Sequence, residues 1–249
     1  MLKRRRWLLL LLILPIVAAV GFVIWANAGP DPMPRALEAL EDGAAVAVST
    51  DRWLVFESVD GEADIGLVFY PGGRVDPRAY APPMRALAEE GVQTVIVPMP
   101  LNLAVLAPNR AADVTDAYPE IDQWAVGGHS LGGAMAARFA HQRPGAVGGL
   151  VLWVSYPAQN DDLSGRDLEV TSIYGTRDGL AAVETVVDSS RLLPPDTEWV
   201  RIEGGNHAQF GWYGTQSGDE AATISREEQQ EIVISATLDL LQSLKEDGE

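Results

Sequence analysis

Cysteine is absent from this chain of 249 residues, and histidine occurs only three times. The lack of thiols excludes disulfide bonds, thiol catalysis and metal sites with cysteine ligands, while it leaves the redox compartment open. Internal repeats and low-complexity tracts are also absent from the sequence. The length that follows the N-terminal leader fits one medium-sized domain with a full core.

Basic residues are the second scarce class. The chain has 18 Lys and Arg against 35 Asp and Glu, and four of the basic residues lie within the first six positions. The remainder therefore carries 14 basic and 35 acidic residues, which is a net charge of −21. A surface of this sign repels nucleic acid and anionic lipid, so we expect no nucleic-acid partner.

One long apolar run is present at the N-terminus. Basic residues 3–6 precede an almost uninterrupted apolar segment at residues 7–26, which is long enough to cross a bilayer as a helix. The basic cluster predicts export of everything that follows. We expect residues 1–28 to be a membrane anchor with the next domain outside the cytoplasm. Ala26-Asn27-Ala28 is also a small-x-small cleavage signal, so a secreted product starting at Gly29 is the alternative.

Beyond a linker and short helix at residues 29–43, strand and helix patterns alternate over residues 44–249. Two strands at the start are expected to form an antiparallel edge, and the alternation predicts an α/β fold, with a mostly parallel central sheet and helices on both faces. The expected strands are 46–50, 53–58, 65–70, 92–97, 123–126, 149–154, 170–175 and 198–202, and the main helices are 77–90, 134–140 and 225–245. In the last helix, Ile232, Leu238 and Leu241 are expected to face inward.

The most informative segment is Gly128-His129-Ser130-Leu131-Gly132, a Gly-x-Ser-x-Gly nucleophile elbow. An apolar strand precedes it and good helix formers follow it, so the context is strand, tight turn and helix. Glycine is needed at both ends because a Cβ there would collide with the neighbouring backbone. Ser130 should therefore present its hydroxyl at a helix N-terminus, where backbone N–H groups can stabilise an oxyanion.

An acid and a histidine follow in chain order. Asp178 lies just past the strand at 170–175, and His207 lies on the loop after the strand at 198–202. The carboxyl ends of parallel strands emerge at one edge, so both residues are expected near Ser130. Asp161 and Asp162 are alternative acids, but their position beside Asn160 suggests a solvated loop.

On these residues, the chain resembles the α/β-hydrolase family over roughly residues 44 to 245. Within that family it is most similar to small serine esterases related to dienelactone hydrolase, which have a minimal cap. The resemblance implies a triad of Ser130, Asp178 and His207. Dienelactone hydrolases proper use a cysteine nucleophile, so the serine here favours an oxygen ester. About fifteen residues separate the strands at 149–154 and 170–175, where a cap would be inserted, so any lid is small.

The remaining site residues are expected around the elbow. The backbone N–H of Leu131 should be the first oxyanion donor, and Gly73 or Arg74, in the loop after the strand at 65–70, should provide the second. His129, Phe210 and Trp212 are candidates for the substrate pocket. For the two aromatic residues, packing beneath the histidine loop is an equal alternative.

Together these features predict a serine hydrolase that cleaves small or medium carboxylic esters through an acyl-enzyme intermediate. The expected partner is a small-molecule ester, and no metal or other cofactor is required. Two alternatives stay open: a lipase or depolymerase acting on long-chain or polymeric esters, and a non-catalytic binding protein on a hydrolase scaffold. The sequence predicts no particular oligomeric state.

Overall fold

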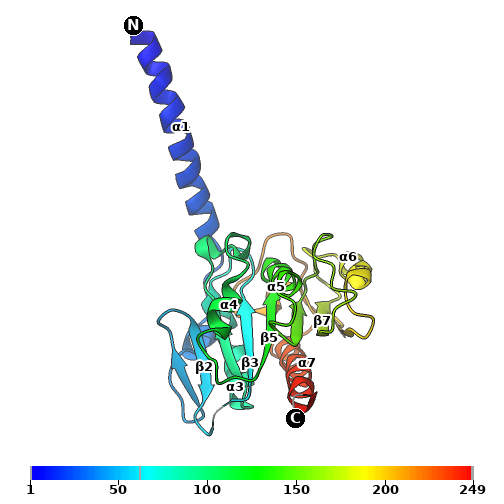
Figure 1. Cartoon of the computed structure of the whole chain (residues 1–249). Coiled ribbons are helices and arrows are strands. Elements are labelled where there is room, and N and C mark those ends of the chain that lie inside the picture. Colours follow the sequence, from blue (N-terminus) through cyan, green and yellow to red (C-terminus); the bar gives the residue numbers. More distant parts are fainter. Residues whose placement is uncertain (1, 62, 248–249) are drawn as a thin grey trace.

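A single sheet forms the centre of the computed structural model, which describes residues 2–61 and 63–247, with side chains from residue 14 onward. Its strands lie in the order β1-β2-β4-β3-β5-β6-β7-β8 (Figure 1). They are β1 (Val46–Ser49), β2 (Leu54–Ser58), β3 (Ile65–Tyr70), β4 (Gln93–Ile96), β5 (Gln123–His129), β6 (Gly149–Trp153), β7 (Glu169–Gly175) and β8 (Glu198–Ile202). Strands β1 and β2 pair antiparallel at one edge, and β3 to β8 pair parallel, as predicted.

Helices and short 3₁₀ turns connect and cover these strands. The α-helices are α1 (Leu2–Asn27), α2 (Pro34–Glu38), α3 (Ala81–Glu89), α4 (Arg110–Thr115), α5 (Leu131–Gln142), α6 (Val183–Asp188) and α7 (Arg226–Asp247). The 3₁₀ turns are η1 (Pro77–Tyr80), η2 (Pro100–Asn102), η3 (Ala104–Leu106), η4 (Ser189–Leu192) and η5 (Ala208–Phe210). This is the α/β-hydrolase fold, with a mostly parallel sheet between two layers of helices.

The two hydrophobic cores follow from the alternation of side chains along each strand. In β3, Leu67 and Phe69 belong to the core beneath α3 and α7, while Val68 and Tyr70 belong to the core beneath α4 and α5. All four side chains are fully buried. Burial on both faces explains why the central strands read as continuous apolar runs rather than as alternating patterns.

The last helix corrects one expectation. Val233 and Leu241 of α7 are fully buried, whereas Ile232 is 39% exposed. Leu238 is half-buried against the core. Of the three residues expected to face inward, Leu241 does so and Leu238 does so in part, and only Ile232 turns outward. Val233, Ala236, Leu240 and Leu244 complete the inward face at helical spacing.

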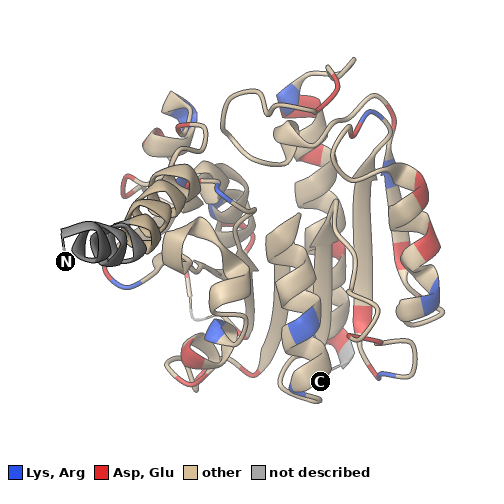
Figure 2. Cartoon of the chain, turned by 90° about the horizontal axis from the view of Figure 1, so that it is seen from above, with Lys and Arg blue, Asp and Glu red and all other residues tan. Residues whose placement is uncertain are grey.

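Acidic residues are spread over the outer helices and loops of the molecule rather than gathered in one patch (Figure 2).

Helix α1 projects from the domain as a single rod (Figure 1), and its side chains from Leu14 to Trp25 are largely exposed. Among the residues searched, no helix combines the length and apolarity needed to cross a membrane. Residues 1–13 of the predicted leader lie outside the part with described side chains, so the leader stays a prediction.

Candidate active site

Ser130 occupies a strained turn between β5 and α5. Its backbone has φ 52° and ψ −121°, a left-handed φ that is unfavourable for a residue with a side chain. Its N–H donates to the carbonyl of Trp153 at 3.0 Å, which fixes the turn to the end of β6. A Cβ on Gly128 would lie 2.5 Å from the backbone of Gly132, and one on Gly132 would lie 2.1 Å from the carbonyl oxygen of Tyr70. The two glycines are therefore required for the close approach, as expected.

Asp178 and His207 form a buried pair at the same edge of the sheet. Asp178 Oδ2 lies 2.7 Å from Nδ1 of His207, and the side chains are 0% and 2% exposed. The other carboxylate oxygen accepts the N–H groups of Leu180 at 2.8 Å and Ala181 at 2.6 Å. Because an ionised carboxylate only accepts hydrogen bonds, Nδ1 of His207 is the donor to Asp178, and Nε2 is the ring nitrogen that this bond leaves free.

The two alternative acids lie elsewhere. Asp161 is not solvated, contrary to expectation: it is 3% exposed and paired with Arg138 of α5 at 3.1 Å. Asp162 is exposed and accepts the N–H of Ser164. Burial of Asp161 follows from its partner, since a buried carboxylate requires a nearby cation or several donors. In the part of the chain that the structure describes, neither residue is hydrogen-bonded or ion-paired to His207, and the backbone carbonyl of Asp162 instead lies 2.8 Å from Nδ1 of His141.

Asp219 is a site residue that sequence reasoning missed. Its carboxylate accepts the N–H groups of His207 at 3.2 Å and Ala208 at 2.9 Å, and also that of Gly179 at 3.1 Å. It thereby joins the loop that carries the histidine to the turn that carries the acid. Gly218 precedes it with φ 93°, which is the local cue for a turn, but nothing in the sequence indicates what the turn contacts.

Of the candidate oxyanion donors, the structure singles out two N–H groups. The N–H of Gly72 donates to the hydroxyl of Tyr80, and that of Arg74 donates to the carbonyl of Asn102 at 2.7 Å. Among the described residues, Gly73 and Leu131 have no acceptor for their backbone N–H. A Cβ on Gly73 would lie 3.1 Å from the Leu131 side chain, so the two peptides are neighbours. Gly73 is therefore the better candidate for the second donor.

His129 is buried against the Asp178–His207 pair and does not line a hollow. It is 1% exposed, and its ring centroid lies 4.5 Å from that of His207. Its Nδ1 lies 2.8 Å from the Tyr80 hydroxyl. Burial lowers the pKa of His129 well below its ordinary value of 6.5, His207 lowers it further, and the backbone of His207 raises it in part. His129 is thus a neutral support for the ring of His207.

Phe210 and Trp212 are also buried rather than lining a hollow. Phe210 is fully buried and stacks on His129 at 5.8 Å between ring centroids. Trp212 is 5% exposed and packs under the guanidinium of Arg35, 4.5 Å above its ring. Phe210 thus packs as in the second of the two predicted alternatives, while Trp212 is buried against Arg35 of α2.

Two modest hollows open at the carboxyl edge. One, of about 400 Å³, borders the oxyanion loop and is lined by Ala28, Gly29, Pro30, Gly73, Arg74, Val75, Thr215, Gln216 and Ser217. The other, of about 340 Å³, follows the end of β6 and is lined by Tyr156, Pro157, Ala158, Gln159, Thr185, Asp188, Ser189, Arg191 and Leu192. Both linings mix apolar and polar groups.

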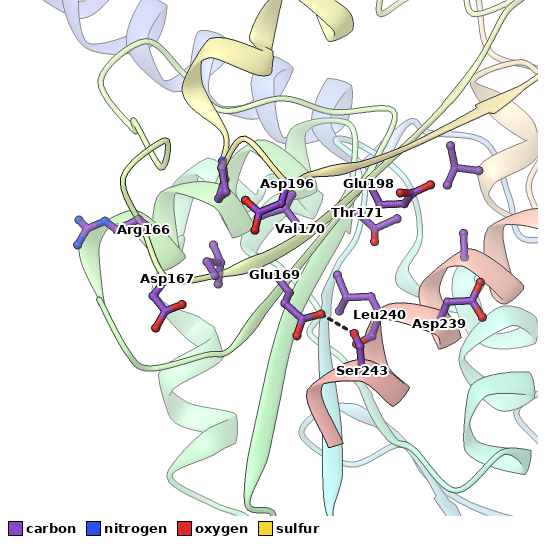
Figure 3. Close-up of a pocket in the computed structure, with 14 residues that line it drawn as sticks. Arg166, Asp167, Glu169, Val170, Thr171, Asp196, Glu198, Asp239, Leu240 and Ser243 are labelled. Carbon is purple, nitrogen blue, oxygen red and sulfur yellow. Dashed lines mark hydrogen bonds between the residues drawn. The ribbon is translucent and has the colours of Figure 1, made fainter. Parts of the chain in front are cut away.

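A larger cavity, of about 640 Å³, lies at the opposite edge of the sheet (Figure 3). Glu169 and Glu198, the first residues of β7 and β8, line it together with Asp239 and Ser243 of α7. This cavity therefore lies at the amino ends of the strands. Ser130 lies at the carboxyl ends, directly after the last residue of β5, so the cavity is remote from it. Within the residues that were searched, no group of three or more His, Asp and Glu side chains could hold a metal ion.

Comparisons with known proteins agree with this architecture. A sequence model described as the alpha/beta hydrolase family matches residues 66–231. No curated protein matches the sequence significantly.

Solved structures are similar in fold at low sequence identity. They include a predicted CIB-like hydrolase from Thermoplasma acidophilum (13% identity, 79% of this chain and 100% of that one, TM-score 0.59) and the thermophilic esterase Est2 from Thermogutta terrifontis (14%, 79% and 93%, 0.56). A third is an alpha/beta hydrolase enzyme from the sediment metagenome of the Mar Chica lagoon, Morocco (18%, 66% and 89%, 0.53).

Proposed function

The chain belongs to the alpha/beta hydrolase family, and from that premise we propose that it is a serine hydrolase of small or medium carboxylic esters. The observation that carries the proposal is the arrangement at the carboxyl edge. Ser130 is held at φ 52° on the elbow, and the ring of its neighbour His129 lies 4.5 Å from that of His207, which is joined to buried Asp178 at 2.7 Å. An acid, a base and a nucleophile in this relation activate a serine hydroxyl.

In the proposed acylation, the Ser130 oxygen attacks the ester carbonyl carbon while Nε2 of His207 takes the hydroxyl proton. Negative charge develops on the carbonyl oxygen, where the N–H groups of Leu131 and Gly73 can donate to it. The bond to the leaving alcohol then breaks, and His207 returns the proton to that alcohol. Asp178 holds the imidazole in the required tautomer and stabilises its cationic form.

Deacylation repeats these steps with water as the nucleophile. Water loses a proton to His207, attacks the acyl carbon, and releases the carboxylic acid as the proton returns to Ser130. The reaction consumes one ester and one water and yields one alcohol and one acid, and each proton is accounted for by His207.

The short connection between β6 and β7 supports a small or medium substrate over a long-chain one. Within residues 154–168 there is no helix that could form a large lid, and the two hollows at the carboxyl edge, of about 400 and 340 Å³, share no lining residue. We expect the ratio kcat/KM for p-nitrophenyl esters to peak at short acyl chains. A peak at long chains would support a lipase or depolymerase instead.

Covalent labelling tests the nucleophile directly. A fluorophosphonate should modify Ser130 in the folded protein, because an activated serine attacks phosphorus and an ordinary turn serine does not. Peptide mapping locates the adduct, and Ser130→Ala should lower kcat by roughly 10⁴- to 10⁶-fold with little effect on folding. A folded protein that is neither labelled nor active would be a binding protein on a hydrolase scaffold.

For its location, we propose a membrane-anchored enzyme with the catalytic domain outside the cytoplasm. The support is the sequence of residues 3–26 and the exposure of Leu14, Ile16 and Ile24, which are 71%, 61% and 64% exposed. Fractionation of cells expressing the full chain should place it with membranes. A soluble product beginning at Gly29 would instead indicate cleavage and secretion.

A further inference from the structure

The C-terminal turn of α1 is joined to the loop that carries the proposed oxyanion donor. The guanidinium of Arg74 donates from Nε to the carbonyl of Trp25 at 2.9 Å and from an Nη to that of Ala28 at 3.1 Å. It also lies 4.4 Å above the ring of Trp25. Helix C-termini leave carbonyls without intrahelical donors and favour cations. A single side chain of the oxyanion loop therefore caps the end of the helix.

The backbone of Arg74 is constrained as tightly as its side chain. It has φ 62°, a strained value for this residue type, and its N–H donates to Asn102 of η2. On its other side, a Cβ on Gly29 would lie 1.7 Å from the Arg74 carbonyl oxygen. The peptide that follows Gly73 is thus clamped between η2 and the segment that leaves α1. This clamped peptide is bonded directly to Gly73, whose own N–H belongs to the peptide just before it.

Burial separates the last turn of α1 from the rest of that helix. Ala26 is fully buried, whereas Leu14 and Val17 are 71% and 60% exposed. The following residues, Ala28 to Pro30, line the hollow of about 400 Å³ together with Gly73 and Arg74. The end of α1 is therefore packed into the catalytic domain and borders the site, while the earlier turns project from it (Figure 1).

We propose that Arg74 is a positioning residue that uses the last turn of α1 to hold the Gly73 N–H in the oxyanion site. The proposal rests on the serine hydrolase function proposed above. Its consequence is that the active enzyme retains residues Trp25–Ala28, because cleavage after Ala28 would remove both carbonyl acceptors and the aromatic partner of Arg74.

Two substitutions in the full-length chain test this from opposite sides of the contact. Arg74→Gln removes the charge and shortens the reach, and Gly29→Ala adds a methyl group where the Arg74 carbonyl lies. The matched controls are Arg78→Gln, whose side chain is bonded to Asp76, and Gly21→Ala, where no described atom lies within 4 Å of the added carbon. If one test variant fails to fold, the other decides.

The measurement is kcat per serine labelled by fluorophosphonate, on a p-nitrophenyl ester and on its thionoester, whose sulfur is a weaker hydrogen-bond acceptor. We expect both test variants to lower kcat on the ester by about 10- to 100-fold, less than the loss of a whole donor, with KM nearly unchanged. The ester-to-thionoester ratio should fall in parallel, and the controls should stay within about twofold of wild type.

Three results would overturn the proposal. Test variants with wild-type kcat would show that the contact with α1 does not position the donor. A lower kcat with an unchanged ester-to-thionoester ratio would show a general structural effect rather than one on the oxyanion. A wild-type chain that is not labelled at Ser130 would remove the proposed function itself and this inference with it, and that failure is recognised before any variant is compared.

Discussion

Backbone conformation differs between the carboxyl ends of the parallel strands, the carboxyl edge of the sheet, and their amino ends, the amino edge. At the carboxyl edge, Arg74, Leu101, Asn102, Ser130 and Val154 all have positive φ, and they follow β3, β4, β5 and β6 in turn. These are all the non-glycine residues with positive φ in the described part of the chain. The amino edge has the larger cavity but no such residue. A strained backbone conformation persists only where surrounding contacts hold it, and such residues cluster at sites whose function requires a fixed geometry.

Hydrogen bonds between loops also distinguish the carboxyl edge from the amino edge. The loops of the carboxyl edge are joined by the buried contact of Asp178 with His207 and by the less buried contacts of Asp219 with the backbone N–H groups of Gly179, His207 and Ala208. The amino-edge cavity is lined by acidic residues that begin strands, such as Glu169 and Glu198, and by residues of α7 that include Asp239 and Ser243. Cavity volume alone would therefore select a different edge from the one that holds the proposed triad.

The largest effect of a single acidic residue is expected for Asp178→Asn. The amide removes the negative charge and allows the wrong imidazole tautomer, so kcat near neutral pH should fall by roughly 10³- to 10⁴-fold while the fold persists. The control is Asp162→Asn, an exposed residue one strand earlier, which should leave kcat within about tenfold. Steady-state kinetics measures kcat, and circular dichroism checks the fold. A larger loss of kcat for Asp162→Asn than for Asp178→Asn would place the acid after β6.

A smaller loss is expected for Asp219→Ala. Removing this carboxylate leaves the N–H groups of Gly179, His207 and Ala208 without their acceptor and frees the two loops from each other. We expect kcat to fall by about 10- to 100-fold through misalignment of the pair. Glu220→Gln, which alters only an exposed ion pair with Arg177, serves as the control. Equal activity of the two variants would mean that the loops hold their geometry without Asp219.

Sequence patterns located the carboxyl-edge residues because their signals are local. The elbow requires glycine at 128 and 132, and strand ends mark Asp178 and His207. Contacts between loops have no such signal. Asp219 and the bonds from Arg74 to α1 join segments 11 to 49 residues apart, and no period or motif connects them. The burial of Phe210 was likewise open, since an aromatic residue after the histidine suits either a pocket wall or a core.

The pH dependence of unfolding tests whether buried His129 is neutral, separately from the role of the Asp178–His207 pair. His129 has a pKa well below 6.5 in the folded state, so below about pH 6.5 the unfolded chain binds a proton that the folded chain does not. Neutral His129 therefore contributes to the free energy of unfolding above that pH. This contribution is lost on acidification, by at most about 1.4 kcal/mol for each pH unit. Urea unfolding at pH 7.5 and 5.5 should show a shallower loss for His129→Gln than for wild type. Parallel losses would mean that His129 is protonated in the folded protein.

The smallest effect is expected at the amino edge. Glu198→Gln and Asp239→Asn each remove a carboxylate from the lining of the larger cavity (Figure 3). Both residues lie at the opposite end of the strands from Ser130, and exposed charges separated by more than about 8 Å are largely screened at physiological ionic strength. Activity on p-nitrophenyl esters should therefore stay within about twofold of wild type, since surface substitutions away from a site change little. A tenfold loss in either variant, with folding intact, would mean that the cavity takes part in the reaction and that the contrast between the two edges is not one between site and scaffold.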